Sequence, residues 1–338
     1  MVRIAINEGE LIQISATGGT TLLEALYERG VNLPSSCGGQ GSCGLCKVRI
    51  EGASGACLPL ERPWLTDEEL AEGTRLACQV RPAGDVRLHL DKALLGAREH
   101  TVRVVARENL TPQIVGITCE LPGSDAIDWS PGQYIQIHLP DSPGAPSHMR
   151  RAYSLASRPG RSRAIEIEVQ RTPGGIGSGY LIDGVRLGDT VKFSGPYGGF
   201  ERRRPDLPLL CVAGGAGAAP VRSVLLDAKE RPGGGGVVFL YAAPTFGEVP
   251  HAEELRSLER DLPGFTFVPV VSRLGGVPAG LPPGGEVGSI IDVLDRRVEQ
   301  GARVEVYLCG SPRLVDGCSR VLAEKGIPSG QIHHDRFV

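Results

Sequence analysis

Three cysteines, Cys37, Cys43 and Cys46, lie within ten residues of one another in a loop made largely of glycine and serine. Glycine lets the backbone wrap tightly and turn its amide groups toward bound sulfur. A fourth cysteine, Cys78, follows in the segment Arg-Leu-Ala-Cys-Gln. Because an iron–sulfur cluster takes four thiolates, we expect Cys37, Cys43, Cys46 and Cys78 to be metal ligands.

Two other interpretations of these cysteines stay open at this point. A zinc site also takes four cysteines, although such sites usually show two separated pairs, and Cys78 has no near partner in the sequence. Buried thiols in an ordinary turn are the other alternative, but packing alone does not require this glycine-rich spacing. Cys57, between the loop and Cys78, is interpreted as a bystander. The nine cysteines accompany no secretion signal, which argues against a disulfide framework.

A second group of candidate residues could bind a flavin nucleotide. Arg151, Tyr153 and Ser154 offer a cation, an aromatic face and a hydroxyl group, which suit a pyrophosphate, a flavin ring and a ring nitrogen. Further along, a glycine turn opens a short helix whose free amide groups can bind phosphate. The residues expected at this turn are Gly174, Gly175 and Ser178.

A third group could bind a nicotinamide dinucleotide. The apolar run Leu209–Ala213 leads into a glycine turn and then a helix. The turn departs from G-x-G-x-x-G, and no acidic residue ends the next strand, so the ribose contact of that fingerprint does not transfer. The expected binding residues here are Gly214, Gly215, Gly217 and Pro220.

Three stretches of the chain, which differ in their pattern of apolar and polar residues, must position these candidates. Residues 1–96 predict a small α+β domain with a helix that begins after Thr20 and ends at Gly30. Residues 97–204 form short alternating segments, which predict an antiparallel β-barrel. Residues 205–338 alternate apolar runs with helices, which is typical of an α/β domain with a parallel sheet covered on both faces.

The cysteine-containing stretch resembles a plant-type [2Fe–2S] ferredoxin, which has a β-grasp fold. That family usually has C-x₄-C-x₂-C spacing, whereas five residues separate Cys37 from Cys43 here. The longer loop resembles the ferredoxin domain in the flavin subunit of sodium-pumping NADH:quinone reductase. The resemblance implies that Cys37, Cys43, Cys46 and Cys78 hold one [2Fe–2S] cluster.

Residues 97–338 resemble the ferredoxin–NADP reductase superfamily through three motifs in the order typical of that family. They are an Arg-x-Tyr-Ser strand, a Gly-x-x-Ser turn and a later Gly-Pro-Tyr-Gly-Gly-Phe run. The resemblance implies that Arg151 contacts the FAD pyrophosphate and that Tyr153 packs on the isoalloxazine ring. It also implies that Ser154 bonds near the ring N5, while Gly175 and Ser178 hold phosphate.

The same superfamily has a Cys-Gly-x-Pro element and often a terminal aromatic residue that covers the flavin. These correspond to Cys309, Gly310 and Phe337. The resemblance implies that Cys309 borders the nicotinamide, with a buried core thiol as the alternative. We therefore expect Ser154, Cys309 and Phe337 at the site of hydride transfer. The neighbouring His333 and His334 are interpreted as surface residues.

Together the resemblances imply an enzyme that takes hydride from NADH into FAD and passes single electrons through the cluster to a partner protein. We favour the reductase component of an oxygenase, since sodium-pumping relatives carry an N-terminal spanning helix that this sequence does not show. The alternatives are a soluble relative of that quinone reductase subunit and an electron carrier that does not itself oxidise NADH. NADH is favoured over NADPH, for which Arg273 is the candidate phosphate-binding residue.

The composition of the chain limits the classes of partner that we expect. The chain has 338 residues and a net charge of −3, which predicts no general attraction to nucleic acid. Residues 1–95 contain nine Lys and Arg against twelve Asp and Glu, so we expect an acceptor protein with a basic docking surface. No run reaches the roughly 18 apolar residues of a membrane span, and the expected location is the cytoplasm.

Overall fold

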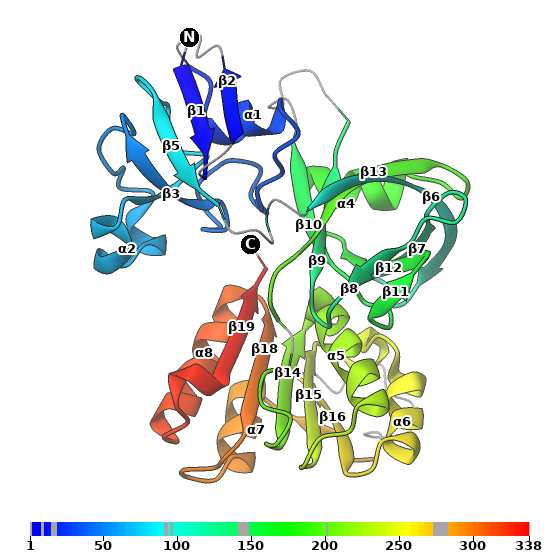
Figure 1. The fold of residues 1–338 in the computed structure, drawn as a ribbon. Coiled ribbons are helices and arrows are strands. Elements are labelled where there is room, and N and C mark those ends of the chain that lie inside the picture. The colour runs from blue at the N-terminus through cyan, green and yellow to red at the C-terminus, as the bar shows by residue number, and fades with distance from the viewer. Residues whose placement is uncertain are drawn as a thin grey trace.

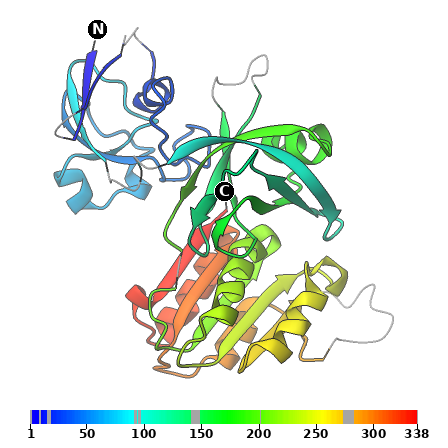
Figure 2. The ribbon, with the colours of Figure 1, turned by 45° about the vertical axis from the view of Figure 1, so that its right-hand side comes forward.

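The computed structural model describes residues 2–7, 10–14, 19–90, 94, 97–140, 149–200, 202–272 and 283–337. Three units follow one another along the chain, blue to cyan, teal to green, and yellow-green to red in Figure 1. The view in Figure 2 shows the middle unit lying between the other two. Each unit contains a sheet of its own.

The first unit is a five-stranded mixed sheet in the order β2-β1-β5-β3-β4, in which β1 and β5 run parallel. Its helix α1 begins one residue later than predicted, because Thr21 forms a capping box with Glu24. Leu22 and Leu26 of α1 are buried in the core of this unit. The elements are β1 (Val2–Ile6), β2 (Glu10–Ile14), α1 (Leu22–Tyr27), β3 (Lys47–Gly52), η1 (Arg62–Trp64), α2 (Asp67–Ala71), β4 (Thr74–Leu76) and β5 (Val86–His89).

The second unit is a six-stranded antiparallel sheet in the order β10-β9-β13-β6-β7-β12. A bridge between Leu155 and Ile167 joins the two ends of that order, which closes the sheet into the predicted barrel. The elements are β6 (Arg98–Asn109), β7 (Ile114–Glu120), β8 (Ile127–Trp129), β9 (Tyr134–His138), β10 (Arg150–Ser154), β11 (Gly160–Ser162), β12 (Ala164–Gln170), α4 (Ile176–Gly179), η2 (Tyr180–Gly184) and β13 (Thr190–Tyr197).

The third unit is a six-stranded parallel sheet in the order β17-β16-β15-β14-β18-β19. Helices α5 and α6 pack on one face, and α7 and α8 on the other, as two separate hydrophobic clusters. The elements are β14 (Leu209–Gly214), η3 (Gly215–Gly217), α5 (Ala218–Glu230), β15 (Val237–Ala243), η4 (Phe246–Glu248), α6 (Ala252–Asp261), β16 (Phe265–Val271), β17 (Glu286–Val287), α7 (Ile290–Arg297), β18 (Glu305–Gly310), α8 (Pro312–Glu324), η5 (Ser329–Gln331) and β19 (Ile332–Arg336).

These three units confirm the predicted fold class, and the carboxyl ends of the parallel strands face the barrel (Figure 1). β5 ends at His89 before β6 begins at Arg98, and β13 ends at Tyr197 before β14 begins at Leu209. Domain limits after residues 96 and 204 remain our proposal. Within the described ranges, no helix is both long enough and apolar enough to cross a membrane.

Candidate cofactor sites

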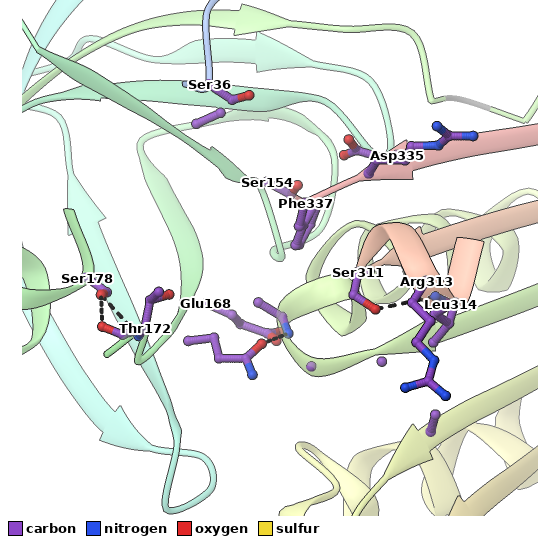
Figure 3. A pocket seen from close by; sticks show the side chains of 18 of the residues that line it. Ser36, Ser154, Glu168, Thr172, Ser178, Ser311, Arg313, Leu314, Asp335 and Phe337 are labelled. Carbon is purple, nitrogen blue, oxygen red and sulfur yellow. Dashed lines mark hydrogen bonds between the residues drawn. The ribbon is translucent and has the colours of Figure 1, made fainter. Parts of the chain in front are cut away.

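One cavity of about 1350 Å³ lies where the three units meet. Residues of all three line it, among them Cys43 of the first, Arg151 of the second and Gly310 of the third. The volume exceeds the 300–1,000 Å³ that is typical of small-molecule pockets, so it suits ligands as large as dinucleotides. Figure 3 shows side chains of the barrel, the parallel-sheet unit and Ser36 around this space.

The four predicted metal ligands lie together as two pairs. The Cys43 thiol hydrogen-bonds Cys37 and lowers the pKa of Cys37, while the same contact raises the pKa of Cys43. A hydrogen bond from Cys46 likewise lowers the pKa of Cys78. Cys57 instead contacts the Leu58 carbonyl, with its Sγ 3.6 Å away.

This paired arrangement fits a two-iron cluster. A [2Fe–2S] cluster takes four thiolates, two at each iron, whereas a zinc ion needs four ligands around one point. Among the described residues, no three Cys, His, Asp or Glu side chains gather closely enough to hold a single metal ion. The pairing of Cys37 with Cys43 and of Cys46 with Cys78 matches two thiolates at each iron of such a cluster.

The cysteine loop depends on its glycines. Gly38, Gly39, Gly41 and Gly44 all have positive φ, which side chains rarely adopt. The indole ring of Trp64 covers Gly44, where an added Cβ would lie 2.6 Å from the ring. Trp64 also lines the cavity, as does Leu45. The loop therefore lies directly at the edge of the cavity.

The barrel wall of the cavity has the features of a flavin nucleotide site. Gly177 lies close to two of the predicted FAD-binding residues. An added Cβ would lie 2.7 Å from Arg151 Cγ and 2.9 Å from Tyr153 Oη. Burial raises the pKa of Tyr153 to about 12, so its ring is neutral. Ser154 lines the same wall (Figure 3). These residues leave a cradle that only glycine keeps open, and they fit FAD.

The predicted phosphate turn is held by its own serine. Ser178 Oγ accepts a hydrogen bond from the Thr172 amide at 3.2 Å, drawn in Figure 3. Gly174, Gly175 and Ser178 all line the cavity, next to the amino end of α4. The amino end of α4 and the nearby Arg151 guanidinium give the wall positive character, which suits a pyrophosphate.

The glycine turn of the parallel sheet lets two strands approach closely. An added Cβ on Gly217 would lie 2.7 Å from the Cys309 carbonyl carbon, and one on Gly310 would lie 3.0 Å from Gly214 O. Gly214, Gly215 and Gly310 line the cavity, whereas Gly217 supports the turn from behind. This opening at the carboxyl ends of β14 and β18 fits the place where α/β sheets bind dinucleotides.

Four consecutive residues at the end of the chain, His334, Asp335, Arg336 and Phe337, line the cavity. Phe337 lines it and donates its backbone N–H to Gly310 O at 2.9 Å. Asp335 also lines it, and burial raises the pKa of Asp335 to about 6. Asp335 was not predicted from the sequence, although it lies in the same C-terminal segment as the predicted Phe337. Of the two adjacent histidines, His334 is exposed as expected, but His333 is largely buried and pairs with Glu305.

Two further cavity residues were not predicted from the sequence either. Gln170 accepts a hydrogen bond from the Ala216 amide at 3.0 Å and so joins the barrel to the glycine turn. Glu168 is buried beside it and pairs with His251 Nε2 at 3.0 Å. Both residues lie on β12 just before the phosphate turn. Their alternation along that strand was the signal that could have placed them on the cavity face.

Two other predicted residues, Cys309 and Pro220, do not line the cavity. Cys309 is fully buried, and burial raises its pKa well above the usual value, so it is a neutral thiol. Pro220 is buried in the first turn of α5. Arg273 lies outside the described residues. The roles of all these residues toward the cofactors stay proposals.

Comparison with known families assigns each of the three units to a family. The chain matches the family "2Fe-2S iron-sulfur cluster binding domain" over residues 6–83. It matches "Oxidoreductase FAD-binding domain" over residues 101–202 and "Oxidoreductase NAD-binding domain" over residues 211–320. The three families account for the [2Fe–2S] cluster, FAD and NAD(P)H that the three parts of the cavity fit.

Two relatives are similar to this chain along nearly its whole length. The propane 2-monooxygenase reductase component of Rhodococcus jostii (strain RHA1) is 32% identical over 332 residues, covering 94% of this chain and 86% of the relative. One subunit of the Na(+)-translocating NADH-quinone reductase of Klebsiella pneumoniae subsp. pneumoniae is 30% identical over 381 residues, covering 99% and 91%.

A solved structure shares the whole arrangement. An Amycolatopsis cytochrome P450 reductase superposes with a TM-score of 0.77 at 26% identity, covering 100% of this chain and 99% of that one. A ferredoxin reductase in carbazole 1,9a-dioxygenase gives 0.73 at 25% identity, covering 100% and 98%. With cysteine pairs, flavin cradle and glycine turn around one cavity, the chain belongs to the iron–sulfur flavoprotein NAD(P)H oxidoreductases that join a [2Fe–2S] ferredoxin domain to ferredoxin–NADP reductase-type FAD and NAD domains.

Proposed function

We propose that this protein is the reductase component of an oxygenase system, which oxidises NADH and delivers single electrons to an oxygenase protein. The observation that carries the proposal is the single cavity lined by ferredoxin, FAD and NAD domains. It brings the cysteine loop, the flavin cradle and the nicotinamide turn around one space. The similarity to propane 2-monooxygenase reductase components along nearly the whole chain supports the choice of acceptor class.

The side chains around the cavity have distinct tasks in this proposal. Arg151 and the turn at Gly175–Ser178 hold pyrophosphate, and Tyr153 packs against the flavin ring. Ser154 lies at the reacting edge, and Phe337 covers the place where nicotinamide must enter. FAD supplies the conversion of a two-electron hydride donor into single-electron transfers. The protein contributes position and the exclusion of water.

We propose NADH as the coenzyme and a basic surface on the acceptor. Exposed carboxylates at α2 and its C-cap support the second point, since Asp67, Glu68 and Glu72 lie on the ferredoxin domain. NADPH would require cations near the ribose 2′-phosphate, and the candidate for that role is Arg273.

The test is anaerobic titration of the purified holoenzyme with NADH and with NADPH. Flavin absorbance should bleach, and the EPR signal of a reduced [2Fe–2S] cluster should follow. The value of kcat/KM should be clearly higher for NADH. The reduced protein should then pass electrons to an oxygenase protein rather than to a quinone. Efficient quinone reduction without any reaction with an oxygenase would support the second candidate, which the similarity to the Na(+)-translocating NADH-quinone reductase favours.

A further inference from the structure

The segment that leads into the cysteine loop, Asn32–Gly38, is attached to the FAD domain by buried polar contacts. Gln136 of β9 donates its Nε2–H to the Ser35 carbonyl at 2.6 Å. The Tyr197 hydroxyl of β13 donates to the Asn32 carbonyl at 3.2 Å. Gln136 is 0% exposed and Ser35 is 1% exposed, so water does not compete for these contacts.

Arg150 is the centre of this attachment. Its Nη1 donates to Asn32 Oδ1 at 2.6 Å, and its guanidinium carbon lies 3.7 Å from the centroid of the Tyr27 ring. The same Nη1 donates to Ser194 Oγ at 3.2 Å, and Nη2 lies 3.5 Å from the partly exposed Glu99 carboxylate. A residue that is only 3% exposed therefore joins α1 and the lead-in segment to the barrel.

A buried cation is costly unless polar or aromatic groups surround it. Burial lowers the pKa of Arg150, which records that cost. The compensating groups come from both domains, so separating the domains would leave the cation without Asn32 and Tyr27. The contact therefore specifies one relative position of the two domains.

The next residue of β10 faces the cofactors. Arg151 lies between Gly38 of the cysteine loop and Gly177 of the flavin cradle, since an added Cβ on either glycine would meet its side chain. Successive residues of a strand point to opposite faces. One strand thus presents Arg150 to the ferredoxin domain and Arg151 to the cavity.

We propose that Arg150, through Asn32 and Tyr27, is the positioning residue that holds the cysteine loop beside the FAD cavity and thereby sets the rate of electron transfer from FAD to the cluster. This inference rests on the proposed electron path. The step moves one electron from reduced FAD to the cluster and converts one ferric iron to ferrous, with the electrons supplied by NADH. Its rate falls steeply with the separation of the two centres, which the Arg150 contacts fix.

The test compares Arg150→Met with Arg103→Met, an exposed arginine on β6 of the same domain, in the full-length holoenzyme. After anaerobic mixing with NADH, flavin bleaching and the EPR signal of the reduced cluster are followed separately. Arg150→Met should bleach at a rate within about twofold of wild type, while cluster reduction slows by about tenfold or more. Arg103→Met should match wild type in both steps. Cluster reduction at the wild-type rate in Arg150→Met would overturn the proposal.

A second measurement does not depend on turnover. Hydrogen exchange of the amides in residues 32–38 should be faster in Arg150→Met than in wild type, and unchanged in Arg103→Met. If Arg150→Met fails to fold or loses FAD, Asn32→Ala removes the same hydrogen bond from the ferredoxin side. Unchanged exchange in the folded variant would reject the anchor. If neither NADH nor NADPH bleaches the wild-type flavin, the proposed function fails, and exchange alone then decides the role of Arg150.

Discussion

At the scale of single residues, Cys57 and Cys78 make the sharpest contrast. Both lie after the cysteine loop, but only Cys78 shares a hydrogen bond with a loop cysteine, Cys46. Gln79 also donates to Cys78 Sγ at 3.3 Å, an additional contact that a thiolate ligand would retain. Cys57 is partly exposed and contacts a carbonyl group instead.

Replacing Cys78 with Ser should therefore abolish or strongly distort the cluster, because one iron would lose a thiolate. Replacing Cys57 with Ser should leave iron content and the EPR spectrum at wild-type values. The measurement is iron and sulfide content together with EPR of the reduced proteins. Loss of the signal in Cys57→Ser with its survival in Cys78→Ser would reverse our assignment of the fourth ligand.

Asp335 should make stability depend on pH. Burial raises its folded pKa to about 6, whereas an unfolded aspartate titrates near about 3.9. Stability from this residue is therefore fully present below about pH 4 and is lost as pH rises through about 6. Asp335→Asn, which cannot ionise, should be more stable than wild type at pH 8 by on the order of 2 kcal/mol.

The check is the thermal midpoint of both proteins from pH 4 to pH 8. The difference between the two thermal midpoints should increase mainly between pH 4 and pH 7. Parallel curves across this range would show that the carboxylate is paired or hydrated in solution.

At the scale of elements, α4 and its turn make a direct test of the flavin cradle. Gly177 and Gly179 lie in the same short helix, but an added Cβ meets Arg151 and Tyr153 only at Gly177. Gly179 has helical φ of −60° and no atom within 4 Å of such a Cβ. An alanine side chain therefore fits at position 179, whereas at position 177 it would collide with Arg151 and Tyr153.

Gly177→Ala should weaken FAD binding by about tenfold or more, or roughly 1.4 kcal/mol, because Arg151 or Tyr153 must move out of place. Gly179→Ala should bind FAD like wild type. Titration of FAD-depleted protein by flavin fluorescence measures both dissociation constants. Equal affinities in the two variants would mean that FAD does not occupy this wall.

The elements themselves were largely predictable, because their signals are local. The alternating and apolar runs predicted both the barrel and the parallel sheet, and Gly30 has the positive φ expected after a helix. Thr21 rather than Thr20 caps α1, since the choice depended on where Glu24 could reach back. Contacts such as Gln170 with Ala216 join residues 46 positions apart, and no local pattern specifies them.

The residues that line the cavity were predictable where they belong to a sequence motif. They were not predictable where tertiary packing alone determines their position. Arg151, Tyr153 and Ser154 line the cavity as their motif predicts. Cys309 belongs to a motif too, yet it is fully buried behind Gly217. Arg150 looks like an ordinary strand residue in the sequence, and only the folded chain brings Asn32 and Tyr27 to it.

At the scale of the whole molecule, the FAD domain is attached differently to its two neighbours. The NAD domain is joined by the Gln170 contact and by charged side chains, with Arg222 bonded to Glu166 at 2.9 Å and His251 to Glu168 at 3.0 Å. The ferredoxin domain is joined through Arg150 and neutral polar groups near the cluster loop. The outer face of the ferredoxin domain keeps its carboxylates exposed on α2. That leaves its acidic charge free for a partner.

The last prediction concerns this charge. Electron delivery to the oxygenase partner should slow as ionic strength rises from low to physiological values, since salt screens attraction between exposed charges over about 8–10 Å. In the proposed function, hydride transfer from NADH to FAD takes place inside the cavity, so its rate should change less. Converting Asp67, Glu68 and Glu72 to their amides should flatten the salt dependence of the partner reaction and lower its rate at low salt. Stopped-flow measurement of both steps across a salt series tests this. A partner reaction that is insensitive to salt in the wild-type protein would reject electrostatic docking through α2 and direct attention to the exposed Leu58 and Leu60 of the same domain.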